Sequence, residues 1–274
     1  ASAPTGIFGT PLREAIAACH LGAMPETPLP EAQSSADVPL KERPQLLQRA
    51  EARAQYIPRI VTRSIESLEK WGVQEEGLYR ISGRSSHSSR LRALWDSPAM
   101  DLDMAAIAPA DLDVHAVCSV LKMYLRELPD PLLPKDVTQV FDRLCTEAAG
   151  GSPLTPDMQR QLAPQLAPLM AQVPICEWYL LRELADHLGR LTEPATVERT
   201  KMPLSNLTLV LAPTVQISVV TLMTVVQLRD VLFNDETRPA PDAALAHEVL
   251  EGDAYRQSTM ARGWRGADTP ASAS

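Results

Sequence analysis

The chain has 274 residues, of which 45% are hydrophobic, and a formal net charge of −8. This length is enough for one large domain or two small ones with a substantial core, and the acidic balance argues against a general nucleic-acid binder. No apolar run reaches the length of a membrane span, and the start lacks the basic and apolar segments of a signal peptide. Because the first residue is Ala rather than Met, we expect the chain to be part of a longer protein.

The cysteines also bear on the class of protein. Cys19, Cys118, Cys145 and Cys176 lie far apart, with no CxxC pair. This pattern favours free thiols in a reducing cytosol over a disulfide framework or a zinc site.

The first part of the chain divides into an arm and an insert. Residues 6–12 form an apolar cluster with turn formers, and a short helical pattern follows at 12–21, so residues 1–21 are predicted to lie as an arm over a core. Residues 22–45 are rich in Pro, Ser, Ala and Glu, and their prolines forbid a regular helix. We therefore interpret 22–45 as a flexible insert.

Helical spacing of apolar residues dominates the remainder, residues 46–234. Besides 12–21, helices are predicted at 57–71, from Ser85 or Ser86 through 94, from Asp111 or Asp113 to 128, and at 135–144, 158–170, 174–191, 203–213 and 219–233. Residues 192–199 are predicted to be a connector, Pro164 and Pro168 to interrupt or kink their helix, and residues 235–274 to be a mostly disordered tail. The predicted fold is all-α, a single domain of about eight or nine helices.

The stretch around Arg80 is the most unusual of the chain. Residues 77–83 read Gly-Leu-Tyr-Arg-Ile-Ser-Gly. The apolar members can hold a short loop against a core, and the glycines permit backbone angles closed to other residues, so Arg80 would project from a fixed base. Four arginines and no acid occur between Arg80 and Arg92, which in an acidic chain indicates a surface for an anionic group or acidic partner. The alternative is an ordinary solvated arginine.

Two later helices carry polar residues beside an apolar stripe. His115, Ser119, Lys122 and Arg126 share one face of the helix that ends before Pro129, since residues three and four apart are neighbours. They are either a solvated flank or reach a neighbouring loop or partner. Asn206 interrupts an otherwise apolar helix, and it either bonds a neighbouring loop or faces outward.

Common catalytic motifs are missing. The chain has no GxxxxGK[ST] phosphate loop and no HExxH, and its five histidines have no metal-site spacing. Ser119 and Lys122 match SxxK, but no SDN or KTG partner follows, so we discount the match. We predict no metal site and no nucleotide site of the chain's own.

Four motifs in this order resemble those of RhoGAP domains. Residues 8–12, Phe-Gly-Thr-Pro-Leu, resemble the usual start of such domains, and residues 76–83 resemble their arginine-finger loop. Residues 122–132, Lys-Met-Tyr-Leu-Arg-Glu-Leu-Pro-Asp-Pro-Leu, resemble the family's Lys-x-x-Leu-Arg-Glu-Leu-Pro helix end. Residues 201–214 resemble its asparagine-bearing helix, and residues 206–218 look closest to the Ral-binding-protein subgroup.

The resemblance implies a GTPase-activating protein for a Rho-family small GTPase, which switches off signalling. Arg80 matches the arginine finger, which enters the GTPase nucleotide site in trans. Arg126 matches the arginine that holds the finger loop from beneath, and Lys122 supports that region and the GTPase contact. Asn206 matches an asparagine that contacts the GTPase and helps to hold its switch region. The GTPase-binding surface is expected to include Gly77, Tyr79, Ser82, Gly83, Arg84 and Pro213, the last closing its helix.

The resemblance also implies that the protein is an activator and not an enzyme by itself. GTP and Mg²⁺ would be bound by the partner, a GTP-loaded GTPase of Rho or Rac type, and no cofactor of its own is expected. We expect a monomeric cytoplasmic domain of a larger multidomain protein, acting in cytoskeletal and polarity signalling and recruited to membranes or cytoskeleton by regions outside this chain. The alternatives are a catalytically silent GTPase-binding scaffold on the same fold and a helical interaction domain unrelated to GTPases.

Overall fold

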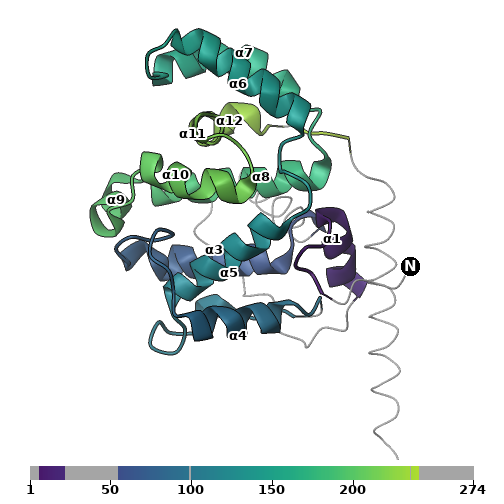
Figure 1. Cartoon of the computed structure of the whole chain (residues 1–274), viewed down its shortest axis with the longest axis vertical. Coiled ribbons are helices and arrows are strands. Elements are labelled where there is room, and N and C mark those ends of the chain that lie inside the picture. The colour runs from purple at the N-terminus through teal and green to yellow at the C-terminus, as the bar shows by residue number, and fades with distance from the viewer. Residues whose placement is uncertain (1–5, 22–54, 99, 235, 241–274) are drawn as a thin grey trace, which may run out of the picture.

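The computed structural model describes residues 6–21, 55–98, 100–234 and 236–240, and within these ranges every regular element is a helix. The predicted all-α class is therefore confirmed. The insert predicted at 22–45 lies outside the described residues, as does the predicted tail apart from residues 236–240. The helices form layers, with α4 at one side and α6 and α7 at the other (Figure 1).

The described residues hold eleven α-helices and two short 3₁₀ helices. They are α1 (Leu12–Leu21), α3 (Arg59–Lys70), η1 (Gly72–Gln74), α4 (Ser85–Trp95), η2 (Met104–Ala106), α5 (Val114–Glu127), α6 (Lys135–Ala149), α7 (Pro156–Met170), α8 (Ile175–Leu191), α9 (Pro194–Thr200), α10 (Leu204–Val215), α11 (Val219–Gln227) and α12 (Arg229–Leu232).

Two short helices account for the difference from the predicted eight or nine. α9 occupies the predicted connector, with a proline in its first turn and a left-handed residue, Lys201 (φ 55°), at its end. α12 is separated from α11 by Leu228, where a single helix over 219–233 was expected. Short segments of this kind have too few turns to show a clear apolar period.

α5 is a central helix of the fold. The Asp113 carboxylate accepts a hydrogen bond of 3.0 Å from the His115 N–H, which confirms one of the two predicted starts of this helix. Its apolar stripe, including Val117, Leu121 and Leu125, is buried. α5 contacts α3, α4 and α10, so a residue on its remaining face has a fixed place relative to three other helices.

Three prolines lie inside helices without ending them. α7 continues through Pro164 and Pro168, and α10 continues past Pro213 to Val215, so the prediction that Pro213 closes its helix is wrong. All three prolines are exposed. A proline has no N–H, so the carbonyl group one turn before it lacks its usual helical donor. On an exposed face, water can hydrogen-bond to that carbonyl group instead.

The N-terminal segment is fastened to α4. The Asp96 carboxylate accepts hydrogen bonds from the backbone N–H groups of Ile7 (3.1 Å) and Phe8 (3.3 Å). The Phe8 ring meets the Tyr124 ring edge-on at 5.7 Å, and the Arg92 guanidinium lies 4.4 Å from the Phe8 ring centre. These contacts place α1 beside the core, where it touches α8.

None of the described helices is by itself long and apolar enough to cross a membrane. α10 and α11 reach that size only when taken together, and they are bent by 116° relative to each other.

A buried ion pair joins α3 to the loop before η2. Arg63 donates from Nε to Asp101 Oδ1 (2.6 Å) and from Nη2 to Oδ2 (3.1 Å), and the two side chains are 8% and 9% exposed. The hydrogen bond to Asp101 raises the pKa of Arg63, although burial opposes this. The guanidinium is charged in any case, and its carboxylate partner compensates the cost of burying that charge.

We expect Asp101→Ala to lower the free energy of unfolding by about 3 kcal/mol, because it leaves a buried guanidinium without its main partner. Asp157→Ala is the matched control, since it removes an Asp–Arg pair whose side chains are 79% and 68% exposed. Denaturant unfolding should show no measurable loss for the control. Equal losses for both variants would contradict the assignment of the buried pair as the stabilising one.

Candidate functional site

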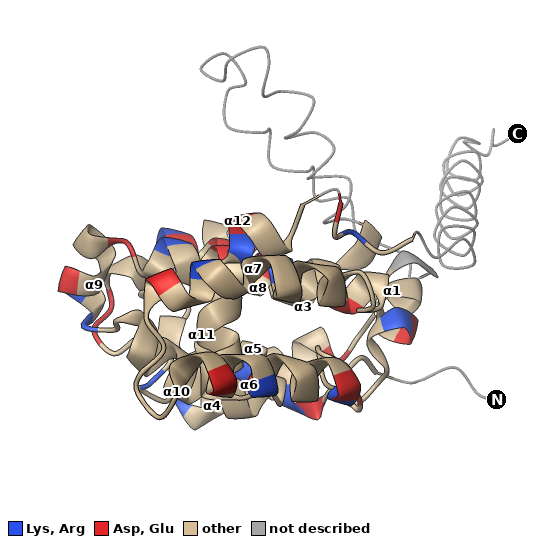
Figure 2. Ribbon diagram, turned by 90° about the horizontal axis from the view of Figure 1, so that it is seen from above, with Lys and Arg blue, Asp and Glu red and all other residues tan. Residues whose placement is uncertain are grey.

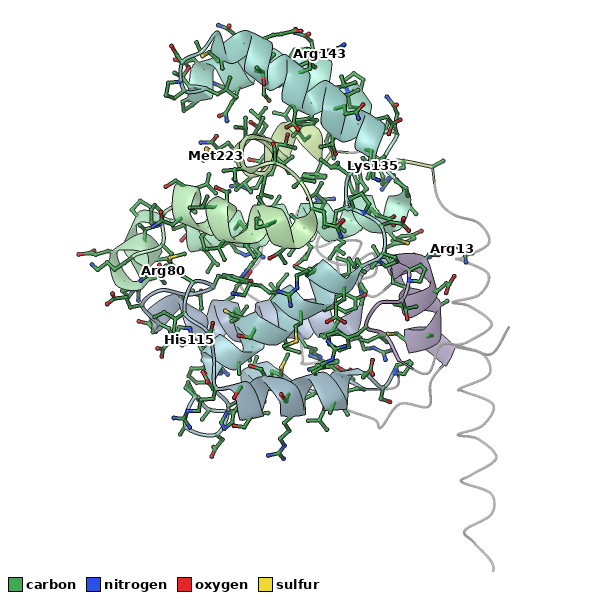
Figure 3. The ribbon with its side chains drawn as sticks, in the orientation of Figure 1. Arg13, Arg80, His115, Lys135, Arg143 and Met223 are labelled. Atoms are coloured by element: carbon green, nitrogen blue, oxygen red, sulfur yellow. The ribbon has the colours of Figure 1, made fainter. Side chains whose placement is uncertain are left out.

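Arg80 lies at the exposed tip of the Arg80 loop, which we define as residues 76–84 between η1 and α4 (Figure 3). The Gly77 N–H donates to the Thr200 carbonyl at 2.7 Å, and the Gly77 carbonyl accepts from the N–H groups of Arg80 and Ile81, both at 2.9 Å. Gly77 has φ +71°, and a Cβ there would lie 2.7 Å from Ile81 Cδ1 and 3.2 Å from Arg80 Nη2. Glycine is therefore required at 77 for both the backbone angle and the space.

Tyr79 fixes the backbone immediately before Arg80. It has φ 67°, an uncommon left-handed conformation for a bulky residue, and its side chain is 1% exposed. Lys122 Nζ donates to the Tyr79 carbonyl at 2.5 Å, and the Tyr79 hydroxyl is hydrogen-bonded to His187 Nε2 at 2.9 Å. The residue that precedes Arg80 is thus held by both its main chain and its side chain.

The far end of the loop is bound to the first turns of α5. The Gly83 N–H donates to Ser119 Oγ (3.3 Å), and the Arg84 N–H donates to Asp113 Oδ2 (2.8 Å). A Cβ at Gly83 would lie 2.1 Å from the Ala116 nitrogen, so only glycine allows this approach. α4 begins directly after Arg84, which is its N-cap, so Ser85 and Ser86 lie in its first turn instead of capping it.

The Asp113 carboxylate both caps α5 and binds the backbone of the Arg80 loop. Burial raises the pKa of this carboxyl, but the backbone N–H groups of Arg84, His115 and Ala116 donate to it and hold the pKa below its ordinary value. The carboxylate therefore remains ionised, and it serves as an acceptor at the junction of α4 and α5.

The predicted polar face of α5 divides into two parts. Ser119 and Lys122 donate to or accept from the backbone of the Arg80 loop. Of the two interpretations left open by the sequence, a solvated flank or contact with a neighbouring loop, the second therefore holds for these two residues. The Arg126 side chain is exposed and makes no hydrogen bond or ion pair with the described residues, so the hold on the Arg80 loop that the resemblance implied for it is not seen among them. Burial lowers the pKa of Lys122, the nearby Arg126 charge lowers it further, and Cys118 acts in the opposite direction. Arg126 is thus close to Lys122 while its guanidinium stays open to solvent.

α10 presents a second exposed face beside α5. The Asn206 side chain is exposed and makes no hydrogen bond with the described residues, and Pro213 is also exposed. Leu209 lies between them on the same face and is 64% exposed, more than any other large apolar side chain among the described residues. Sequence reasoning missed Leu209, although its spacing of three residues from Asn206 was a signal. Gln216 Nε2 donates to the Leu128 carbonyl (3.2 Å) and so ties the ends of α10 and α5 together.

The arginine cluster separates into structural and exposed members. Arg92 donates to both Glu127 oxygens, at 2.5 and 2.9 Å, and so joins α4 to α5. Arg80, Arg84 and Arg90 are exposed and form no ion pair with the described residues. The run of arginines without acids therefore gives three exposed cations, Arg80 and Arg84 in the loop and Arg90 on α4. Along the other helices, basic and acidic positions are interspersed (Figure 2).

A cleft of about 330 Å³ lies beside the loop. Its lining includes Arg84, His87 and His115 together with the carboxylates of Glu75 and Asp113. Figure 3 shows His115 on the same side of the molecule as Arg80. Because its charges have both signs and Asp113 is already engaged, the cleft is not a basic anion pocket. No cluster of metal-ligating side chains occurs among the described residues.

The model of the RhoGAP domain family matches residues 58–218, which is more than half of the 274 residues. The chain belongs to the RhoGAP family. Proteins of this family activate GTPases, and a RhoGAP domain implies a small GTPase as partner. The matched region contains the Arg80 loop, the polar face of α5 and the exposed face of α10.

Relatives and a solved structure agree with this assignment. RalA-binding protein 1-A of Xenopus laevis is 33% identical over 165 residues, covering 59% of this chain and 22% of that protein. Rho GTPase-activating protein gacY of Dictyostelium discoideum is 35% identical over 157 residues, covering 57% and 20%. The chain thus spans about a fifth of each of these relatives. The BH domain of GRAF, the GTPase regulator associated with focal adhesion kinase, shares the fold, with a TM-score of 0.51, 22% identity, and coverage of 66% of this chain and 95% of that one.

We expect Gly83→Ala to lower the free energy of unfolding of the RhoGAP domain by about 1–3 kcal/mol, because the added methyl group meets the α5 backbone. The amide hydrogen of Arg84 should exchange faster, since the loop must move away from Asp113. Gly150→Ala is the control: it has φ +55° and open space, so it costs a similar amount by backbone strain alone. Equal Arg84 exchange in both variants would show that Gly83 does not hold the loop.

Proposed function

We propose that this domain stimulates GTP hydrolysis by a small GTPase of Rho or Rac type, by inserting Arg80 in trans into the nucleotide site. One observation carries the proposal. The Arg80 side chain is exposed and makes no hydrogen bond or ion pair with the described residues, while the backbone on both sides of it is held by hydrogen bonds. The Arg80 guanidinium thus does not stabilise its own fold, although its backbone is held in place. Such a side chain is available to interact with another molecule.

The chemistry of guanidinium suits this task. Phosphoryl transfer spreads negative charge over the oxygens of the transferred group and the leaving oxygen, and catalysis depends on positioned positive charge. Arg is always charged and presents a planar set of donors. GTP and Mg²⁺ belong to the partner, so the domain supplies one side chain and is not an enzyme by itself. An arginine finger of this kind is worth about 10³ to 10⁵ in rate.

The surrounding surface supports binding of a protein partner. Arg126, Asn206 and Leu209 are exposed and lie on two adjacent helices. We propose that these three side chains contact the GTPase together with Ser82, Arg84 and Pro213, which are also exposed. Gly77 and Tyr79 are buried, so their part is to shape the loop. Gly83 is partly buried and has the same part.

We further propose that the domain works in the cytoplasm as part of a longer, multidomain protein. The much greater length of the relatives supports this proposal. We also propose that recruitment to membranes or cytoskeleton comes from regions outside this chain.

Arg80→Ala should remove most of the stimulated hydrolysis, a loss of about 10³-fold or more, while binding of the GTP-loaded GTPase changes little. The measurement is single-turnover hydrolysis with a panel of Rho and Rac type GTPases, with binding followed separately. Arg90→Ala is the matched control, because Arg90 is another exposed arginine without an ion partner among the described residues. It should retain full activity.

Two other outcomes would overturn the proposal in different ways. If the wild-type domain binds a GTPase but does not accelerate hydrolysis, the protein is a catalytically silent scaffold. If it binds no GTPase, even one carrying a planar mimic of the transferred phosphoryl group, it is a helical interaction domain of another kind.

Lys122→Met and Arg126→Met should have distinct effects. Lys122→Met removes the donor to the Tyr79 carbonyl, so the amide of Arg80 should exchange faster in the free domain and the maximal rate should fall about 10-fold. Arg126→Met should leave exchange in the free domain unchanged and weaken GTPase binding. Identical exchange in the two variants would contradict the support role given to Lys122.

A further inference from the structure

A chain of polar groups runs from the Arg80 loop through the buried Tyr79 and His187 side chains to the partly exposed Glu69 and Arg190. The Tyr79 hydroxyl meets His187 Nε2 at 2.9 Å, and His187 Nδ1 meets Glu69 Oε1 at 2.8 Å. Arg190 Nε donates to the same Glu69 oxygen at 2.8 Å. His187 is fully buried. The four residues come from the loop, α8 and α3, so the chain links the loop to two core helices.

The hydrogen-bonding capacity of each group sets the direction of the bonds. Burial raises the pKa of Glu69, but the hydrogen bonds that it accepts from His187 and Arg190, together with the Arg190 charge, outweigh this and lower it, so the carboxylate is ionised and only accepts. His187 Nδ1 therefore carries the proton that is donated to Glu69. In the neutral imidazole Nε2 is then an acceptor, and it receives the hydroxyl of Tyr79, which burial keeps protonated by raising its pKa.

Among the described residues, the lining around this bond offers no other polar side chain to substitute in it. Tyr79 and His187 border a void of about 10 Å³, roughly the space of one water probe, and the remaining lining is apolar. It consists of Leu125, Leu184, Leu188, Leu211, Val215 and Leu222. A water that entered would find few partners there. Loss of either member would leave the other polar atom buried without a partner.

The bond acts at a strained position of the backbone. Tyr79 has φ 67°, and non-glycine residues persist in this region only when their surroundings hold them there. The dihedral angles of Tyr79 set the direction in which Arg80 leaves the core. A hydroxyl held by His187 therefore restrains the one backbone position that aims Arg80.

We propose that His187, held in turn by Glu69, is a positioning residue that fixes Tyr79 and thereby directs Arg80 toward the bound GTPase. This inference rests on the proposed function. Tyr124 shows that the hydrogen bond is not needed merely to bury a tyrosine in this fold, because Tyr124 is fully buried and its hydroxyl has no partner in the part of the chain that the structure describes.

The test is a double-mutant cycle with Tyr79→Phe, made in the wild-type and Arg80→Ala backgrounds. In wild type the maximal rate of stimulated hydrolysis should fall about 5- to 20-fold, the effect on rate of roughly one lost hydrogen bond. The Kd for the GTP-loaded GTPase should change less than twofold. In the Arg80→Ala background Tyr79→Phe should have no further effect, because it acts only through Arg80.

Two further variants complete the design. Tyr124→Phe removes a hydroxyl from the same core and should leave the maximal rate unchanged. Tyr79→Phe combined with His187→Phe should be no slower than Tyr79→Phe alone. The double variant also loses the bond between His187 and Glu69, but that bond acts on the loop only through the Tyr79 hydroxyl, which is already absent. A full rate for Tyr79→Phe, or an equal loss in both Arg80 backgrounds, would overturn the inference.

Failure of the proposed function has a different signature. In that case wild type and Arg80→Ala give the same hydrolysis rate, and the position of the loop is read from amide exchange instead. The N–H groups of Arg80 and Ile81 both donate to the Gly77 carbonyl, so Tyr79→Phe should speed their exchange while Tyr124→Phe does not. Unchanged protection in Tyr79→Phe would overturn the positioning role independently of any GTPase.

Discussion

The hydrogen bond from Lys122 Nζ to the Tyr79 carbonyl is the contact on which the Arg80 loop most depends. It joins the centre of α5 to the main chain one residue before Arg80. Asp113 and Ser119, on the same helix, hold the far end of the loop through the N–H groups of Arg84 and Gly83. One helix thus sets the loop at three points, and because α5 is buried against three other helices, the loop takes its position from the core.

Holding the loop by its backbone leaves the Arg80 side chain without a role in the fold. Arg63 and Arg92 show the contrast, since both donate two hydrogen bonds to a carboxylate and serve as links between elements. A long side chain that is free in solution loses conformational freedom when it binds, but an ordered base limits that loss to the side chain itself. An arginine that is supplied to a partner requires both features, a backbone fixed by the fold and a side chain that the fold does not use.

The exposed faces of α5 and α10 extend the site beyond the loop. They are adjacent because the two helices pack together and because Gln216 joins their ends. Arg126, Asn206 and Leu209 place a charge, an amide and an apolar side chain on the exposed faces of these two helices. Such a mixture is typical of protein interfaces, in which a few apolar contacts lie among polar groups.

The sequence by itself determined the all-α class, most helix positions and the family, because apolar periodicity and short motifs are local properties. It left the start of α5 open between Asp111 and Asp113, and the structure selected Asp113. The sequence also predicted that Lys122 shares a face with Ser119. Only the tertiary structure decided that Lys122 and Ser119 reach the loop while Arg126 and Asn206 face solvent, and that Leu209 is exposed. It alone brought Tyr79, His187 and Glu69 together, because residues more than a hundred positions apart meet through packing, which no local pattern records.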